Sequence, residues 1–300
     1  MPHNTSVQYF HPLIVIAGLL TLVPYFAAAF FPARADGCAR RLPAWAQILA
    51  PSLLCIPYAL VTVAAGIFNP LWLAVYALLP PLIALIARLA PGDDRIIWPQ
   101  LGILAILGLA VDLRWFEPAW PPHLAVFNKV ILLDAGIYAF VALRPIAGTG
   151  FDLRLRFRDC VSGLREFVFY LPIALALGLA LGFLHTHQIT AHFVSLIGQF
   201  AAAWVFTFFF IAVPEELFFR GWLQNLLERR MGRIAALVVA SALFGLSHFN
   251  KRAAHFNWQY VLLAAIAGIF YGRAWRRHRR VGASAVTHAT VDAVWSVFLR

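Results

Sequence analysis

The sequence predicts an all-α, polytopic membrane protein, because its composition is strongly apolar, its apolar runs are long, and its basic residues are confined to short segments between those runs. Of its 300 residues, 62% are hydrophobic and 12% are charged, and the mean hydropathy is +0.78. A soluble domain holds about half apolar and about a quarter charged residues. The composition therefore excludes an ordinary soluble domain.

The apolar runs predict about ten transmembrane helices, since about 20 helical residues cross the hydrocarbon core of a bilayer. A polar segment at residues 144–165 separates an N-terminal scaffold of about five helices, residues 1–143, from a C-terminal helical core, residues 166–300. The runs themselves lie at about residues 12–32, 44–67, 69–90, 97–113, 124–143, 166–184, 195–213, 233–248, 258–272 and 282–299.

The net charge of +11 comes from short arginine clusters, not from one basic stripe, and this pattern disfavours nucleic-acid binding. If the helix count holds, these clusters share one side of the membrane, which the positive-inside rule makes cytoplasmic. They also predict contacts with anionic lipid. The protein is expected to be a multi-pass integral protein, of the inner membrane in a prokaryote. The clusters lie at residues 34–41, 88–95, 144–165, 220–233 and 273–280, and the opposite loops chiefly hold Arg114, Lys129 and the pair Lys251 and Arg252.

Two adjacent carboxylates, Glu215 and Glu216, directly follow the uncharged run 200–213. A carboxylate at membrane depth is costly unless it is paired, protonated or faces a polar cavity, so the pair indicates a functional site. A helix that continues through them to about Arg230 is about 50 Å long at about 1.5 Å per residue. After a turn at Met231 and Gly232, an antiparallel helix brings His248 to a similar depth as Glu215.

Three residue pairs in this half of the chain have i,i+4 spacing, which places both members on one helix face. Adjacent residues point about 100° apart, so Glu215 and Glu216 are expected to have different tasks. The simplest division pairs Glu216 with Arg220 and leaves Glu215 for chemistry. Phe244 is expected to pack in the wall of the site. The three pairs are Glu216 with Arg220, Phe244 with His248, and His288 with Asp292.

A carboxylate beside a histidine in a partly dehydrated site can take a proton from water. A second histidine, held by a hydrogen-bonding partner, can donate to the oxyanion of a tetrahedral intermediate. These groups predict a peptide-bond hydrolase that uses neither a covalent nucleophile nor a metal or other cofactor.

The three motifs, in this order and spacing, resemble those of the type II CAAX prenyl endopeptidase and bacteriocin-processing (Abi, CPBP) family of intramembrane glutamate proteases. The resemblance covers about residues 195–297. It implies a membrane-associated or lipidated peptide substrate and an active site toward the cytoplasmic side. It also implies that Glu215 activates water with His248, that Glu216 and Arg220 support the site, and that His288 and its partner form the oxyanion hole.

Asp292 departs from the family pattern, in which asparagine usually follows the last histidine. An ionised aspartate only accepts hydrogen bonds, so Asp292 can orient His288 but donates to an oxyanion only when protonated. Prenylated CAAX proteins, leader peptides and C-terminal sorting segments all fit such an enzyme.

Other functions remain open from the sequence. A non-catalytic membrane binding or immunity module on the same fold is the main alternative. A zinc-dependent protease would use Glu215, His248 and His288 as ligands, although HExxH is absent. Serine catalysis through Ser284 and a proton-coupled transporter are less favoured, because neither a nucleophile elbow nor an inverted repeat is present. The cysteines Cys38, Cys55 and Cys160 form no CxxC motif, which disfavours a disulfide framework or zinc knuckle.

Overall fold

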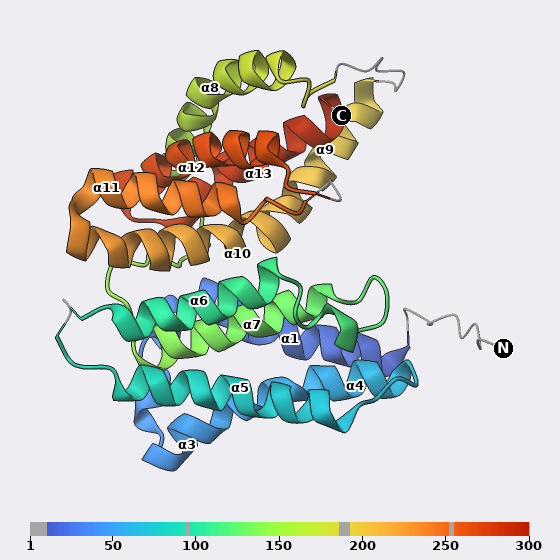
Figure 1. Ribbon diagram of the computed structural model, residues 1–300, viewed down its shortest axis with the longest axis vertical. Helices are drawn as coiled ribbons and strands as arrows, with labels where there is room; N and C mark the ends of the chain where they lie inside the picture. The colour runs from blue at the N-terminus through green and yellow to red at the C-terminus, as the bar shows by residue number, and fades with distance from the viewer. Residues whose placement is uncertain (1–10, 94–95, 186–192, 252–254, 300) are drawn as a thin grey trace. The chain divides into compact units, whose positions relative to one another are not determined.

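The computed structural model describes residues 11–93, 96–185, 193–251 and 255–299, and every secondary-structure element within them is helical (Figure 1). The all-α class predicted from the sequence is therefore confirmed for these residues. Arg95 and Arg252, which the charge analysis singled out, lie outside them. The chain divides into two compact units, Met1–Ile146 and Ala147–Arg300.

The N-terminal unit packs α1 against α4 and α7, and α5 against η2. Three buried polar side chains in this unit bond to one another. Tyr76 donates its hydroxyl hydrogen to Asn128 Oδ1 at 2.8 Å, and Trp120 Nε1 donates to the Tyr76 oxygen at 2.7 Å. The elements are α1 Pro12–Phe30, α2 Pro32–Ala35, η1 Cys38–Arg41, α3 Ala44–Leu49, η2 Ala50–Cys55, α4 Ile56–Ala64, α5 Pro70–Leu89, α6 Trp98–Asp112, η3 Glu117–Ala119, α7 Val126–Ile137 and η4 Tyr138–Leu143.

The C-terminal unit contains one long helical path that begins at Phe193 and turns back at Gly232. The backbone at Gly232 has φ 78° and ψ 173°, which a residue without a Cβ adopts without strain. The long helix through the glutamates and the turn after it are therefore present, as the sequence predicts. The elements are α8 Phe157–Ala180, α9 Phe193–Thr207, η5 Phe208–Ala212, α10 Val213–Glu216, η6 Leu217–Gln224, α11 Asn225–Leu246, α12 Trp258–His278 and α13 Val281–Phe298.

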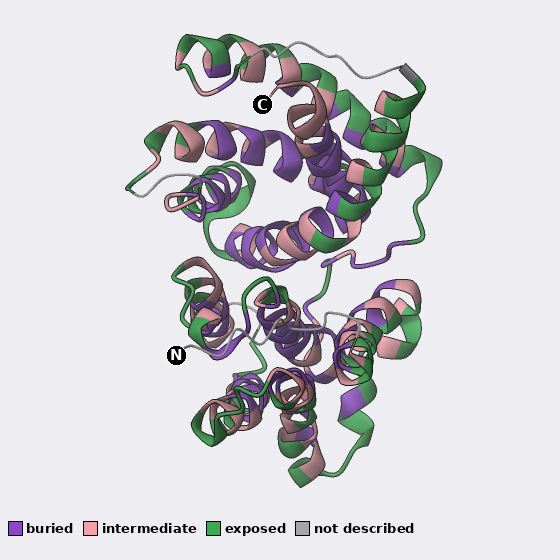
Figure 2. Cartoon of the chain, turned by 90° about the vertical axis from the view of Figure 1, so that its right-hand side faces the viewer, coloured by how far each residue is buried: buried purple, intermediate pink, exposed green. Residues whose placement is uncertain are grey.

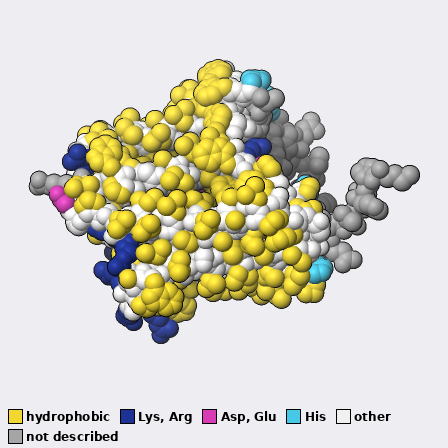
Figure 3. Space-filling model, turned by 60° about the horizontal axis from the view of Figure 1, so that its bottom comes forward, with side chains coloured by type: hydrophobic (Ala, Val, Ile, Leu, Met, Phe, Trp, Pro, Cys, Tyr) yellow, Lys and Arg dark blue, Asp and Glu magenta, His cyan; other side chains and the backbone are white. Residues whose placement is uncertain are grey.

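Six helical segments among the described residues are long and apolar enough to cross a membrane, so the count of about ten crossings is not confirmed. Each apolar run is helical, but α6 is short, and α12 and α13 are not among the six. Figure 3 shows a face on which hydrophobic side chains predominate, with Lys and Arg gathered at one edge. The six are Pro12–Phe30, Ala44–Ala64, Pro70–Leu89, Val126–Leu143, Phe157–Ala180 and Val194–Leu246, the last of which includes the turn.

Small residues let the helices of the C-terminal unit approach closely, as in many membrane bundles. A Cβ at Gly245 would lie 2.5 Å from the carbonyl oxygen of Val261, and one at Gly163 would lie 2.7 Å from that of Ala283. The first contact joins α11 to α12, and the second joins α8 to α13. Figure 2 colours the buried residues of the chain purple.

Arg280, at the start of α13, bonds to the segment before α8 and to the first turn of α8. Its guanidinium donates to Asp159 at 2.8 and 3.0 Å and to Asp152 at 3.1 Å. Two further hydrogen bonds reach the carbonyl oxygens of Asp152 and Arg154. Residues 157–165, assigned from the sequence to the polar connection, form the first turns of α8.

Asp152 lies in the polar segment before α8, outside the helices. Partial burial raises the pKa of its carboxyl, but hydrogen bonds from Arg154 and Arg280 outweigh that effect, and the pKa lies well below its usual range. A lowered pKa in the folded state contributes stability that is present above the unfolded value, about pH 4, and is lost as the pH falls through the folded value. This junction is therefore stable at neutral pH and weakens only in strong acid.

Replacing Gly163 by alanine is expected to lower stability, because the added methyl group meets a backbone carbonyl that cannot move aside. Overpacking costs about 1–3 kcal/mol, against a gain in helix propensity of about 1 kcal/mol. Gly198→Ala is the matched control, because Gly198 has no atom within 4 Å of its Cβ position. The thermal unfolding midpoint in detergent should be lower for Gly163→Ala than for the wild type and should not be lower for Gly198→Ala. Equal midpoints would contradict the close α8–α13 contact.

Candidate active site

The structure brings all seven residues singled out from the sequence into one cluster within the C-terminal unit. The segment α10 and η6 supplies the two glutamates and Arg220. Phe244 lies near the end of α11, with His248 just beyond it, and α13 supplies His288 and Asp292. Three stretches far apart in the sequence therefore meet at one place.

A fully buried carboxylate, Glu216, holds this cluster together. Its Oε2 lies 3.1 Å from Arg220 Nε, and its Oε1 lies 2.9 Å from His288 Nδ1. Because a carboxylate only accepts hydrogen bonds, the Nδ1 of His288 carries the donated proton. Glu216 thus joins α13 to the long helix by a charge-assisted bond, the stronger kind.

Aromatic rings surround the buried guanidinium of Arg220. Its Cζ lies 4.8 Å from the Phe244 ring centroid and 5.9 Å from that of Tyr271, within cation–π range. Tyr271 also stacks on His288, with centroids 4.6 Å apart and an interplanar angle of 15°. Phe244 contacts both histidine rings, at 4.9 Å for His248 and 5.6 Å for His288. The wall residue expected from the sequence is therefore central to the cluster.

Glu215 lies at the edge of this buried cluster and is partly exposed. Its Oε1 lies 3.6 Å from Lys251 Nζ, and its Oε2 lies 4.0 Å from His288 Nε2. The separation of roles between adjacent glutamates follows from the angle of about 100° between successive helical side chains. Glu216 is bound on both oxygens, whereas Glu215 lies at the accessible side of the cluster.

His248 is held in one tautomer by the backbone. Its Nδ1 lies 2.8 Å from the carbonyl oxygen of Phe244, which only accepts, so Nδ1 carries the hydrogen. In the neutral ring, Nε2 then bears the lone pair and can accept a proton from water. The ring also contacts Tyr260, at 4.8 Å between centroids.

Asp292 faces the second nitrogen of His288. Its Oδ2 lies 3.6 Å from Nε2, one helical turn along α13. Glu216 contacts the ring more closely, at Nδ1, so His288 lies between carboxylates on both sides. The sequence pointed to Asp292 as the partner of His288, and the structure adds Glu216 as the nearer one.

Lys251 and Tyr271 also belong to the site, and sequence reasoning missed both. Lys251 was assigned only to a loop, and Tyr271 was not singled out. The sequence feature that could have indicated Lys251 is its position three residues after His248. Nothing in the spacing of Tyr271 indicates its contact with His288, because that contact depends on how α12 and α13 are rotated.

A zinc site needs three or more well-placed donor side chains. Among the residues that the structure describes, no group of three or more His, Cys, Asp or Glu side chains is placed to hold a metal ion.

Comparison with known protein families gives a match in the part of the chain that contains these residues. Residues 197–294 match the family model described as type II CAAX prenyl endopeptidase Rce1-like. This segment belongs to that family. It includes all seven cluster residues and covers about a third of the chain. No match to the chain was found among curated proteins or among solved structures.

Replacing Arg220 by lysine is expected to destabilise the family segment, because an ammonium group offers neither the planar fork nor the stacking surface of a guanidinium. A disrupted buried ion pair costs about 3–5 kcal/mol. The control is Arg154→Lys, at a guanidinium whose side chain is 61% exposed. The thermal unfolding midpoint in detergent should fall for Arg220→Lys and stay unchanged for Arg154→Lys. An unchanged midpoint for Arg220→Lys would contradict the clustered geometry.

Proposed function

We propose that the protein is an intramembrane endopeptidase of the glutamate type, which hydrolyses a peptide bond of a membrane-associated or lipidated substrate. The family match and the candidate membrane helices support this proposal. The observation that carries it is the asymmetry of the two glutamates. Glu216 is fully buried and bound on both oxygens, whereas Glu215 is accessible beside His288 and Lys251.

The proposed reaction begins with a water molecule held between Glu215 and His248. One of these two groups takes a proton from the water, and the water oxygen forms a bond to the carbonyl carbon of the peptide. The resulting oxyanion accepts a hydrogen bond from His288 Nε2 when that nitrogen carries a proton. The carbon–nitrogen bond then breaks, and the proton taken from water passes to the leaving amine.

The supporting residues hold this geometry without touching the substrate. Glu216 fixes the ring of His288 from Nδ1, and Arg220 balances the charge of Glu216. Phe244 separates Arg220 from the two histidines and sets their spacing. The backbone carbonyl of Phe244 sets the tautomer of His248.

The first functional prediction concerns Glu215. Glu215→Gln keeps the shape of the side chain but removes its capacity to accept a proton, and a general base contributes about 10²–10⁴-fold. Purified protein in liposomes, given a quenched peptide with a lipid or membrane anchor, should lose turnover by that order. Glu117→Gln, in the N-terminal unit, is the control and should keep full turnover. Full turnover of Glu215→Gln would exclude a mechanism that depends on Glu215, whereas no turnover by the wild type would favour a binding module.

Turnover of the same peptide in the presence of a metal chelator distinguishes glutamate chemistry from metal chemistry. Turnover that survives prolonged chelation agrees with proton transfer through Glu215. Turnover that is abolished by chelation and restored by zinc would assign the cluster to a metal site instead.

The second prediction concerns Asp292, the departure from the family pattern. If Asp292 only orients His288, Asp292→Asn should preserve or raise turnover, because an amide can also donate a hydrogen bond toward an oxyanion. The measurement is kcat with the anchored peptide, with Asp292→Ala as a comparison. A loss of about 10²-fold or more in Asp292→Asn, the scale of a lost general acid or base, would show that the carboxylate takes part in proton transfer.

A further inference from the structure

We infer that Lys251 is a positioning residue of the active site, whose positive charge offsets the negative charge that Asp292 adds and so keeps Glu215 ionised. This role rests on the proposed function, because Glu215 must be ionised to take a proton from water. It joins a lysine that belongs to none of the three motifs to an aspartate that stands where asparagine is usual.

Three carboxylates face one imidazole ring, that of His288. Glu216 lies 2.9 Å from its Nδ1, and Asp292 and Glu215 lie 3.6 and 4.0 Å from its Nε2. Because Asp292 and Glu215 lie near the same nitrogen atom, their carboxyl groups are close neighbours. Two like charges that share a site disfavour the ionised form of each. Asparagine at position 292 would remove this repulsion.

Each of the two glutamates has a cation beside it. Arg220 Nε lies 3.1 Å from Glu216 Oε2, and both side chains are fully buried. Lys251 Nζ lies 3.6 Å from Glu215 Oε1, and these side chains are 34% and 27% exposed. An opposite charge within about 4–6 Å favours the ionised form of a carboxyl group. Lys251 therefore acts on Glu215 in the opposite direction to Asp292.

The backbone of Lys251 is hydrogen-bonded on both sides, which places its side chain relative to the site. Its N–H donates to the carbonyl oxygen of His248 at 3.2 Å, and its own carbonyl oxygen accepts from Asn257 Nδ2 at 3.1 Å. Asn257 is also the N-cap of α12, because its Oδ1 accepts from the N–H of Tyr260. The start of α12 and the end of the His248 motif therefore hold Lys251 between them.

Lys251 also acts on His248, the second group beside the proposed water molecule. His248 follows the candidate span Val194–Leu246, and burial together with the charge of Lys251 lowers its pKa to about 4. The ring is therefore neutral at neutral pH, and its Nε2 bears a lone pair. The same ammonium group thus favours the states in which both Glu215 and His248 can accept a proton.

The elements around Glu215 determine which other charges act on it. The helical turn α10, which carries Glu215, packs chiefly against η5, η6 and α13. No side chain of η5 is ionisable, and the guanidinium on η6 is already ion-paired with Glu216. The charge balance at Glu215 therefore depends on the ammonium group, on the added aspartate and on the protonation of the imidazole on α13. The ionisable side chains on η6, on α13 and in residues 247–251 are Arg220, His288, Asp292, His248 and Lys251.

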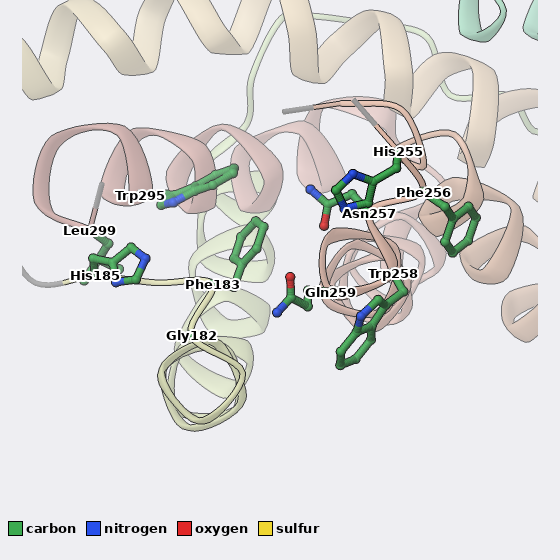
Figure 4. Close-up of a pocket in the computed structure, with 10 residues that line it drawn as sticks. All are labelled: Gly182, Phe183, His185, His255, Phe256, Asn257, Trp258, Gln259, Trp295 and Leu299. Carbon is green, nitrogen blue, oxygen red and sulfur yellow. The ribbon is translucent and has the colours of Figure 1, made fainter. Parts of the chain in front are cut away.

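Two more histidines lie beyond Asn257, which also lines a cavity of about 790 Å³ (Figure 4). His185 and His255 line the same cavity and are exposed, so solvent and salt screen their charges. Their titration is common to the wild type and to variants at positions 251 and 292. It therefore cancels when the pH profiles of these proteins are compared.

The test is the pH dependence of kcat/KM for the anchored peptide in liposomes, measured for the wild type, Lys251→Met, Asp292→Asn and the double variant. Methionine keeps the aliphatic stem and removes the charge. The acidic limb of this profile reports the base in the free enzyme. In Lys251→Met it should move to higher pH by about one pH unit, the lower end of the range for an opposite charge, because both side chains are partly exposed. In the double variant it should return most of the way to the wild-type position.

Two lysine variants serve as controls. Lys251→Arg keeps a positive charge and should keep the wild-type limb, and Lys129→Met, at an exposed lysine of α7, should leave the profile unchanged. An acidic limb that does not move in Lys251→Met would overturn the inference. A double variant whose limb stays where Lys251→Met places it would overturn the link to Asp292. Lys251→Gln repeats the test if Lys251→Met does not fold.

An infrared titration needs no turnover and isolates Glu215 from His248. Protonation of Glu215 on acidification produces a carboxylic-acid band, which is assigned by its absence in Glu215→Gln. The band should appear at higher pH in Lys251→Met than in the wild type and shift back in the double variant. The same onset in the wild type and Lys251→Met would overturn the inference. A shifted band in a protein that cleaves no peptide would support the role of Lys251 and count against the endopeptidase alone.

Discussion

The buried carboxylate of Glu216 is the constraint on which the C-terminal unit depends. It lies within a candidate membrane-spanning segment, with one oxygen ion-paired to Arg220 and the other bonded to His288. An unpaired charge in that position would cost several kcal/mol. Arg220 comes from the next turn of the same helix, and His288 comes from α13. The close α11–α12 and α8–α13 contacts and the ring stacking of Tyr271 on His288 form the apolar surrounding in which the pair is held.

The same constraint separates two neighbouring carboxylates into different roles. Because Glu216 must face α13, the helix rotation turns Glu215 toward Lys251 and the accessible side. His248 reaches the same region from the antiparallel arm, with its tautomer set by a backbone carbonyl. The buried carboxylate of Glu216 therefore fixes the positions of its neighbours, whereas the partly exposed carboxylate of Glu215 can take part in chemistry. That arrangement suits a hydrolase that activates water without a covalent intermediate.

Much of this arrangement is predictable from sequence because it is local. The helical class, the long helix through the glutamates, the turn at Gly232 and the Glu216–Arg220 pair follow from apolar run length and i,i+4 spacing. The Glu216–His288 bond joins residues 72 positions apart, and no periodicity specifies it. Lys251 and Tyr271 were missed for the same reason, since their contacts depend on how whole helices are rotated. Run length alone does not give the number of crossings, because α12 and α13 correspond to apolar runs of the sequence but are not among the six candidate spans of the described residues.

Glu216 and His288 are expected to act as one energetic unit, and a double-mutant cycle measures the coupling between them. The unfolding free energy in detergent is determined for the wild type, Glu216→Gln, His288→Gln and the double variant. Residues in one hydrogen-bonded network are expected to show a coupling of about 0.5–3 kcal/mol, so the double variant should lose less than the sum of the single losses. Additive losses, within about 0.5 kcal/mol, would contradict the account.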